Sequence, residues 1–382
     1  MMKKLATLAL VSLLAACAGT DNSPQPTPLK DVRNSVNLQS AWHASFGSSS
    51  LFGFGQDVTG LFRFAPDVTG DAVYMAGVNG VAGFALADGH KLGEMRGDKP
   101  LAGGIGAASG LVVAGTLKGD VYGWDADGKQ RWKARVSSEM VSPPVVAEGV
   151  AVVRTVDGRV WGLDAKDGKV RWQFQRNQPS LILRNYAPVT VADGAVYIGL
   201  ASGRLASLSL ADGRVLWESL VAQPKGATEL ERISDVTSAP VVSRGTVCAV
   251  AFQGKVACFA VSNGSLLWAR DVSSYAGLAM DADKVYVSDE TGNVQAFDRS
   301  GGRSLWKQAD LYGRRVSGPA VYAGYVAVGD FEGYVHLLSP SDGSIVARLQ
   351  TDKSRVLVAP RVVNSTLVVQ TESGGLHALA VK

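Results

Sequence analysis

Short runs of alternating apolar and polar residues occur along almost the whole chain. Residues 159–165 (RVWGLDA) and 293–299 (NVQAFDR) are typical of them. A two-residue period predicts β-strands, because successive side chains of a strand point to opposite faces. No segment repeats its apolar residues with a helical period, so we expect no substantial helix. Asp-Gly, Asn-Gly and Gly-Gly pairs separate many of the runs and supply the positive φ angles of tight hairpin turns.

The alternating runs belong to a unit that recurs eight times. The clear copies begin with glycine, end with tryptophan and span residues 119–132, 158–172, 203–217, 254–268 and 292–306. Weaker copies begin at Gly80, Gly333 and Gly374. Successive leading glycines are 39, 39, 45, 51, 38, 41 and 41 residues apart. Two more short strands precede each leading glycine, so each unit is expected to contain four strands.

Repeats of this kind predict an all-β protein, an eight-bladed β-propeller of four-stranded antiparallel blades. A sheet that is apolar on both faces cannot stand alone, and radial stacking buries it against its neighbours. We expect each repeat tryptophan to lie in an outer strand and fill the wedge between blades. The last unit stops after its third strand, whereas residues 38–47 (LQSAWHASFG) provide a spare strand with its own Trp42. This N-terminal strand is expected to join the last blade and close the ring.

The first residues predict export. An apolar run at residues 5–14 leads through Leu14-Ala15-Ala16 to Cys17. It is too short for a transmembrane helix and typical of a signal peptide. The stretch resembles the bacterial lipoprotein box, in which the cysteine is lipidated, and Ala18 after it implies outer-membrane delivery. We therefore assign residues 1–16 to a lipoprotein signal peptide, 17–37 to a lipidated flexible tether and 38–382 to the propeller.

Charge balance narrows the range of partners. Without Lys3 and Lys4 the chain carries 36 basic and 34 acidic residues. Such balance argues against nucleic acid or an anionic surface as the main partner. No other apolar run is long enough to span a membrane.

The cysteines after Cys17 are Cys248 and Cys258, which flank a predicted hairpin turn at Gln253-Gly254. If that turn has two residues, the two side chains point to opposite faces and cannot form a disulfide. A longer loop would reverse this. We interpret the pair as two small buried apolar side chains.

The repeat also raises an enzyme hypothesis. Its pattern A-x-D-x-x-x-G-x-x-x-W, seen in residues 296–306, resembles the tryptophan repeat of propellers that bind pyrroloquinoline quinone. That resemblance implies a vicinal cysteine pair, a calcium site and a catalytic aspartate, and the sequence offers no such constellation. Asp125, Asp164 and Asp298 share one repeat position and are expected to bond within their own hairpins. We expect no cofactor, no metal and no catalytic residue, and keep a quinone-dependent dehydrogenase as an alternative.

Other candidate chemistry is sparse. The histidines are scattered without ligand spacing: His43, His90, His336 and His377. Phenylalanines gather near glycines within residues 51–70: Phe52, Phe54, Phe62 and Phe64. An aromatic platform of this kind would suit a polysaccharide-binding propeller, which is a second alternative. We favour packing of the first blade as their role.

Two adjacent unit spacings, 45 and 51, exceed the others, and the extra residues must leave the blades as loops. One extension contains residues 178–188 (QPSLILRNYAP) and the other residues 223–236 (QPKGATELERISDV). Both connect the tryptophan strand of one blade to the next blade, so they are expected to meet on one face. Alternating leucines rimmed by charge are typical of a protein interface. The predicted patch consists of Leu181, Leu183, Arg184, Glu231, Arg232 and Asp235.

A second arrangement of these loops stays open. The leucines can tuck beneath their own loop, with Arg184 paired only to Asp235. In that case the stretch would be structural and would offer no docking surface.

A lipoprotein box, a Pro-rich tether and an eight-bladed tryptophan-repeat propeller together resemble the BamB family of the outer-membrane β-barrel assembly (BAM) machinery. Local matches are ERISDV (residues 231–236) and VGDFEGYVH (residues 328–336). The resemblance implies docking on the periplasmic POTRA domains of BamA through Leu181, Leu183 and Arg184, and through an acidic loop at Asp235. Relatives can carry a second aspartate where this chain has Thr237, and Glu231 is the candidate substitute.

The function expected on these grounds is that of a non-enzymatic scaffold of the BAM complex. It would be a monomer within a hetero-complex, anchored through Cys17 at the periplasmic face of the outer membrane. It would assist the folding and insertion of outer-membrane proteins. Unfolded clients would pair with exposed strand edges by β-augmentation.

Overall fold

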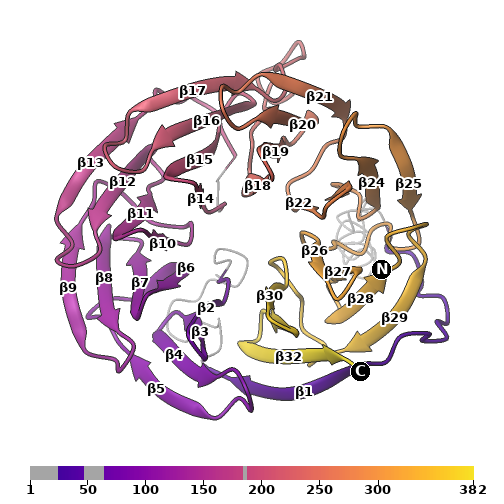
Figure 1. Ribbon diagram of the computed structural model, residues 1–382, viewed down its shortest axis with the longest axis horizontal. Coiled ribbons are helices and arrows are strands. Elements are labelled where there is room, and N and C mark those ends of the chain that lie inside the picture. The colour runs from indigo at the N-terminus through magenta and orange to yellow at the C-terminus, as the bar shows by residue number, and fades with distance from the viewer. Residues whose placement is uncertain (1–24, 47–63, 184–186) are drawn as a thin grey trace, which may run out of the picture.

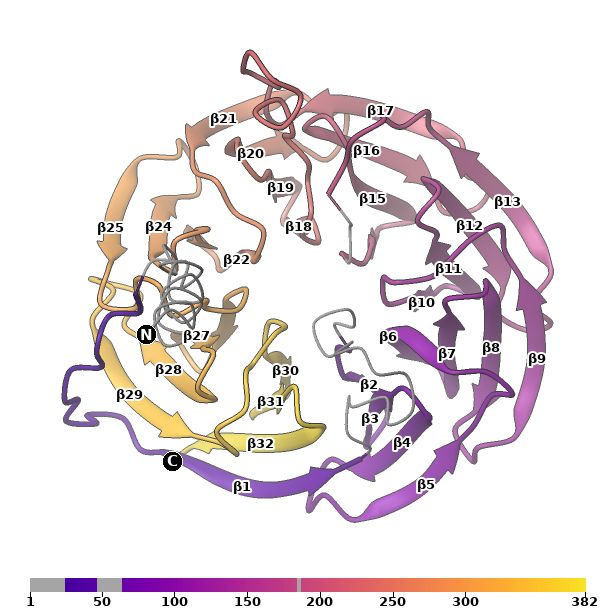
Figure 2. The same ribbon diagram turned by 180° about the vertical axis from the view of Figure 1, so that it is seen from behind.

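Every regular element in the described part of the chain is a β-strand. The computed structural model describes residues 25–46, 64–183 and 187–382, and within them the strands form eight four-stranded antiparallel sheets. The sheets are arranged radially, and the first strand of each blade lies nearest the axis (Figures 1 and 2). These ranges contain no helix, and therefore none that would cross a membrane. The predicted eight-bladed β-propeller is confirmed.

The first four blades are meanders of consecutive strands that run from the axis outward. Blade 1 contains β2 (Asp67–Thr69), β3 (Ala72–Gly77), β4 (Gly80–Ala85) and β5 (Lys91–Met95). Blade 2 contains β6 (Leu101–Ala108), β7 (Leu111–Thr116), β8 (Asp120–Asp125) and β9 (Gln130–Arg135). Blade 3 contains β10 (Val145–Ala147), β11 (Val150–Arg154), β12 (Arg159–Asp164) and β13 (Val170–Gln175). Blade 4 contains β14 (Thr190–Ala192), β15 (Ala195–Leu200), β16 (Arg204–Ser209) and β17 (Val215–Leu220).

The remaining blades repeat this order, and the last one takes its outer strand from the N-terminal region. Blade 5 contains β18 (Val241–Ser243), β19 (Thr246–Val250), β20 (Lys255–Ala260) and β21 (Leu266–Asp271). Blade 6 contains β22 (Gly277–Met280), β23 (Lys284–Ser288), β24 (Val294–Asp298) and β25 (Ser304–Gln308). Blade 7 contains β26 (Ala320–Tyr322), β27 (Tyr325–Gly329), β28 (Tyr334–Leu338) and β29 (Ile345–Gln350). Blade 8 contains β30 (Arg361–Val363), β31 (Thr366–Gln370), β32 (Gly375–Val381) and β1 (Leu38–Ser45).

The burial of each strand follows its radial position. β7 (LVVAGT) is buried at every residue because neighbouring blades cover both of its faces. β13 (VRWQFQ) lies at the rim and exposes most of its side chains while burying Trp172. One apolar cluster joins Val152 and Val160 of blade 3 to Ile198 and Ala206 of blade 4, so the core lies between blades.

Ring closure occurs as the sequence predicts. β1 pairs antiparallel with β32, in a register that runs from Leu38 opposite Val381 to Ser45 opposite Gly375. Blade 8 is therefore made from both ends of the described chain, and the pairing removes an exposed sheet edge at the junction.

The repeat tryptophans connect each blade to the next. In six blades the outer-strand tryptophan donates its indole N–H to a backbone carbonyl of the following blade, at 2.7–3.0 Å. The donors are Trp42, Trp132, Trp172, Trp217, Trp268 and Trp306, and the acceptors are the carbonyls of Leu86, Ala165, Leu210, Val261, Arg299 and Pro340. Burial of a large ring thus comes with a satisfied polar group, which stabilises the junction.

Each of these rings packs on the hairpin glycine of the neighbouring blade. Gly264 has a φ of +70°, and a Cβ atom there would lie 2.6 Å from the Trp217 ring. A side chain at this turn would therefore displace the tryptophan as well as strain the backbone. The outer strands of blades 1 and 7 carry Gly93 and Ala347 at the tryptophan position, so their junctions lack this contact.

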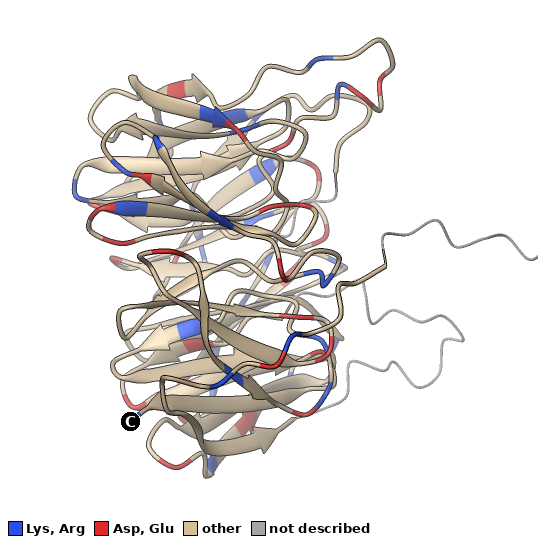
Figure 3. Ribbon diagram, turned by 90° about the vertical axis from the view of Figure 1, so that its right-hand side faces the viewer, with Lys and Arg blue, Asp and Glu red and all other residues tan. Residues whose placement is uncertain are grey.

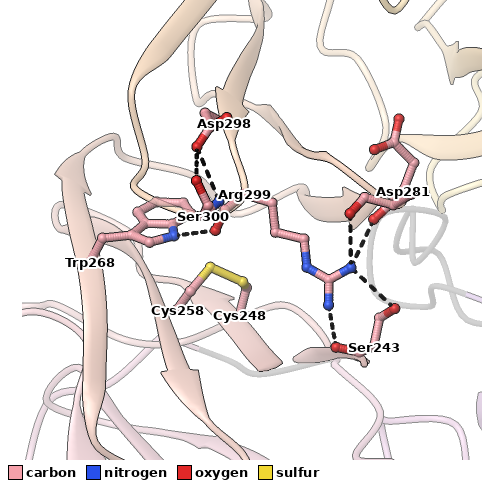
Figure 4. The surroundings of a disulfide bond; sticks show 9 residues. Ser243, Cys248, Cys258, Trp268, Asp281, Asp298, Arg299 and Ser300 are labelled. Atoms are coloured by element: carbon pink, nitrogen blue, oxygen red, sulfur yellow. Dashed lines mark hydrogen bonds between the residues drawn. A yellow bond between two sulfur atoms is a disulfide. The ribbon is translucent and has the colours of Figure 1, made fainter. Parts of the chain in front are cut away.

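The cysteine pair differs from the interpretation made from the sequence. Cys248 and Cys258 lie directly opposite each other on β19 and β20 and form a disulfide (Figure 4). Val250 is paired with Val256, so five residues, 251–255, separate the last paired positions, and this odd number places the two side chains on one face. The assumption of a two-residue turn was wrong, because the register leaves a longer turn, which includes Gln253 with its positive φ.

The buried Arg299 packs near the disulfide and joins two blades (Figure 4). Its guanidinium donates to the backbone carbonyls of Ser243 in blade 5 and Asp281 in blade 6. Trp268 donates to the carbonyl of Arg299 itself at 2.7 Å. The charge of Arg299 is therefore met by carbonyl dipoles at a blade junction.

Residues 25–37, the second part of the segment assigned to the tether, lie against the propeller. Figure 1 shows this segment outside blades 6 and 7. The backbone N–H of Thr27 donates to the carbonyl of Tyr312 at 2.9 Å, and Arg348 donates to the carbonyl of Lys30 at 2.8 Å. Ser35 continues the contact through Val346, so the chain reaches β1 along a fixed path.

The motif VGDFEGYVH forms a buried polar network in blade 7. Asp330 accepts hydrogen bonds from Arg314 at 2.8 Å and from His336 Nε2 at 3.1 Å. Arg348 donates to the other ring nitrogen of His336, and burial lowers the pKa of this histidine. A neutral imidazole that donates through Nε2 and accepts at Nδ1 satisfies both contacts. The motif therefore has a structural role. It binds Arg314 and Arg348, and these two arginines donate hydrogen bonds to backbone carbonyls of the N-terminal segment.

We predict that Trp217→Ala will lower the free energy of unfolding by about 3 kcal/mol, because it leaves a cavity at a blade junction and removes the bond to Val261. Urea denaturation followed by tryptophan fluorescence measures the change. Leu216→Ala, on the exposed side of the same strand, is the matched control and should change stability by less than about 0.5 kcal/mol. Equal effects of the two variants would contradict the inter-blade role of Trp217.

Candidate protein-docking site

Two long connections lie next to each other on one face of the propeller. Loop A (residues 176–189) joins β13 to β14, and loop B (residues 221–240) joins β17 to β18. Loop B stands out from the face at the top of Figure 3, where it carries charged residues of both signs. The extra residues of the two longest repeat spacings therefore lie outside the blades, between blades 3 and 4 and between blades 4 and 5.

Asp235 ties the two loops together. One carboxylate oxygen accepts a hydrogen bond from the backbone N–H of Leu183 at 2.8 Å, across loop A. The other accepts from the backbone N–H of Ser202 at 2.9 Å, in the turn between β15 and β16. Phe252 of blade 5 donates to the carbonyl of Asp235 at 2.9 Å. This buried residue thus positions both loops, and its side chain is already occupied by backbone donors.

Loop B also holds its own tip in place. The carboxylate of Glu231 accepts from the backbone N–H groups of Ala227 and Thr228, at 2.7 and 3.2 Å, and these bonds lower its pKa. Arg232 donates to the carbonyl of Ala227 at 2.9 Å. Both side chains are exposed, yet each is engaged within the loop. Glu231 and Arg232 therefore stabilise loop B, in addition to the partner contact expected of them.

The apolar residues of the loops differ in exposure. Leu181 is 41 % exposed, Leu183 is half-buried, and Arg184 lies outside the described residues. Leu230 of loop B is 66 % exposed, although the sequence pattern did not single it out. Leu230 is a single apolar residue in the charged run TELER (residues 228–232), and an isolated leucine there does not form a recognisable apolar pattern.

A groove of about 230 Å³ separates the loops. Its walls are Pro179 and Leu181 from loop A, and Pro224, Arg232 and Ile233 from loop B. Glu229 and Asp235 line the groove as well, so its apolar walls carry charges of both signs. Such a lining suits a partner side chain that is apolar in part. Two further cavities beneath loop A share Arg154 of β11, a second residue that the sequence pattern did not single out.

The remaining candidate residues lie elsewhere. Thr237 lines a cavity at the central axis, and its buried hydroxyl has no hydrogen-bond partner within the described ranges. Phe52, Phe54 and Phe62 lie outside the described residues, while Phe64 packs in the core between blades 1 and 2. Thr237 therefore makes no contribution to the surface of loops A and B.

The repeat aspartates have structural partners. Asp164 and Asp298 accept backbone N–H groups within their own hairpins, whereas Asp125 pairs with Arg131. Residues 25–46, 64–183 and 187–382 contain no group of three or more His, Cys, Asp or Glu side chains that would hold a metal ion.

Fold and loops define the class: an eight-bladed tryptophan-repeat propeller with a composite loop surface on one face. Residues 77–308 and 291–382 match the family model of the outer membrane protein assembly factor BamB. A BamB of Burkholderia pseudomallei is 39% identical over 375 residues, which cover 97% of this chain and 96% of the relative. The chain belongs to the BamB family.

Solved structures agree with the fold. The crystal structure of BamB from Moraxella catarrhalis superposes with a TM-score of 0.81 at 26% identity, over 90% of this chain and 100% of that chain. A quinohemoprotein alcohol dehydrogenase from Pseudomonas putida superposes with a TM-score of 0.71 at 13% identity, over 93% and 77% of the two chains. At that identity the second likeness concerns the propeller fold alone.

We predict that Asp235→Ala will loosen both loops, because it leaves the N–H groups of Leu183 and Ser202 without their acceptor. The expected loss of stability is about 1–3 kcal/mol. Amide hydrogen exchange should accelerate at these two residues, and exchange in blades 7 and 8 should stay unchanged. Asp271→Ala, at an exposed rim position, is the control. Unchanged exchange at Leu183 would show that Asp235 does not hold loop A.

Proposed function

We propose that this protein is a non-enzymatic lipoprotein scaffold of the BAM complex that docks on the POTRA domains of BamA. The observation that carries the proposal is the hydrogen bond between Asp235 and Leu183, which joins two loops of adjacent blades and leaves Leu181 exposed at the groove between them. A fixed apolar surface with a charged rim is typical of protein interfaces. Membership of the BamB family supports the same assignment.

Docking would use the two loops in different ways. Leu181 and the groove between the loops would receive an apolar side chain, with Leu183 supporting them from below and Arg184 adding a charge. Asp235 would act by positioning loop A, since its carboxylate is already bonded to the backbone. Glu231 and Arg232 would hold the tip of loop B and form the polar rim.

The N-terminal features favour a place for this scaffold at the periplasmic face of the outer membrane. Cys17 follows an apolar run and two alanines and would carry the lipid, and Ala18 favours outer-membrane delivery. The disulfide between Cys248 and Cys258 is typical of an oxidising compartment.

Unfolded clients have a second surface at the rim. Leu216 and Leu220 of β17 and Leu266 and Leu267 of β21 are exposed on outer strands. A client strand that pairs along such an edge would bury these side chains by β-augmentation.

We predict that Leu181→Asp and Arg184→Glu will each abolish co-purification with BamA, because a charge is introduced or reversed at the centre of the proposed interface. The melting temperature should change by less than about 3 °C, because both substitutions fall in a loop outside the blades. Leu92→Asp, at an exposed leucine of blade 1, is the matched control and should retain binding. Retained binding by both loop variants would refute the proposed docking site. Reduction of a redox dye with added pyrroloquinoline quinone and calcium would instead support the dehydrogenase alternative.

We also predict that Cys17→Ser will release the protein from the outer membrane into the soluble periplasmic fraction, because the lipid anchor is lost. Membrane fractionation and immunoblotting measure the distribution. Persistence of the variant in membranes after a salt wash would show that another element anchors it.

A further inference from the structure

Arg154 is a buried cation without a bonded partner among the described residues. It is the last residue of β11 and is 8 % exposed. Its guanidinium makes no hydrogen bond and no ion pair with residues 25–46, 64–183 or 187–382. Asp235 attracts it at longer range, and both oxygens of that carboxylate are bonded to backbone N–H groups. A buried charge without a bonded partner is costly and marks a functional site more often than a structural one.

The guanidinium lines a cavity of about 230 Å³ between blades 3 and 4 and loop A. Three arginines line this cavity: Arg154, Arg176 and Arg204, together with polar groups of Gln178 and Ser202. No carboxylate is among the described lining residues. Glu218 pairs with Arg176 and Arg204, each at 2.8 Å, and not with Arg154. The cavity is therefore suited to an anion.

A neighbouring cavity has the opposite balance. It shares Arg154 and Gln178, and its lining adds Glu139 and Asp235. Two carboxylates disfavour an anion there, so a negatively charged group would enter from the arginine side. Burial lowers the pKa of Arg154 to about 10, against the attraction of Asp235, and the side chain remains charged at neutral pH.

The arginine-lined cavity adjoins the groove between the loops. Pro179 and Ser202 line both of them. A polypeptide seated on Leu181 and the groove would therefore reach the cavity with a side chain of a neighbouring residue. Its position beside this surface favours an acidic side chain of the docked protein over a free ion.

We propose that the cavity at Arg154 receives an aspartate or glutamate side chain of the polypeptide that docks on loops A and B. This inference rests on the proposed function and names the chemistry by which the partner is recognised. Arginine presents a planar fork that binds a carboxylate through two parallel hydrogen bonds. Because Arg154 is already removed from water, part of the cost of burying the ion pair is met before binding.

The test is binding of BamA POTRA domains to the full chain, measured by calorimetry with three variants of Arg154. Arg154→Met should weaken binding at least about tenfold, because it leaves the acidic side chain buried without a partner. Arg154→Lys should restore part of the affinity, since lysine keeps the charge and loses the fork. The control Arg171→Met removes a rim arginine of the same blade and should bind as the unchanged protein.

A charge exchange identifies the partner residue. Arg154→Glu should bind poorly to the POTRA domains, and reversal of one acidic POTRA residue to arginine should recover binding to this variant alone. The melting temperature of Arg154→Met should stay the same or rise, because a desolvated charge is removed. A large fall in the melting temperature would assign Arg154 a structural role and overturn the inference.

The outcomes separate the inference from the function on which it rests. If Leu181→Asp abolishes binding while Arg154→Met binds within twofold of the unchanged protein, the inference is wrong and the docking site stands. If neither variant weakens binding, the docking site itself is wrong. If inorganic phosphate or vesicles of phosphatidylglycerol bind in an Arg154-dependent manner and POTRA affinity is unchanged, the cavity is an anion or lipid-headgroup site and the proposal fails.

Discussion

Each sheet of this protein is apolar on both faces, and a neighbouring sheet must cover each face. Closure through β1 and β32 meets this requirement around the ring, because no blade is left with an uncovered side. The indole of each repeat tryptophan reinforces it, since the ring fills the wedge between outer strands while its N–H satisfies a carbonyl of the next blade. Without these junctions a four-stranded blade would lack the core that makes it stable.

The same requirement determines where sequence variation is tolerated. A blade cannot lengthen without disturbing two neighbours, so additional residues leave as connections on one face. Loops A and B follow adjacent blades, which brings distant parts of the sequence together. Asp235 then converts two loops into one surface, because a single carboxylate bonds to Leu183 and to Ser202. The surface is therefore fixed by the propeller rather than assembled on binding.

Buried charges in the structure fall into two kinds. Asp330 is bonded to both Arg314 and His336, and Arg299 donates to carbonyl oxygens at a blade junction. Such satisfied networks stabilise one arrangement of the chain. Arg154 differs, since its guanidinium faces a cavity and meets no bonded acceptor among the described residues. The bonded charges stabilise the fold, whereas Arg154 is the group that we propose binds a ligand.

The sequence by itself determined the number of blades, their strand order, the closing strand with Trp42 and the location of the two long loops. These features follow from the period of the apolar residues and from the spacing of the repeats, both of which are properties of the amino-acid sequence. The disulfide depended on the residue count of one turn, which dipeptide patterns do not specify. Tertiary structure alone decided three further features: the hydrogen bonds of the Asp235 carboxylate to backbone N–H groups, the path of residues 25–37 and the exposure of Leu230. The absence of a bonded partner for Arg154 among the described residues was also decided there, because its surroundings include residues of blade 4 and of both loops, which are distant in the chain.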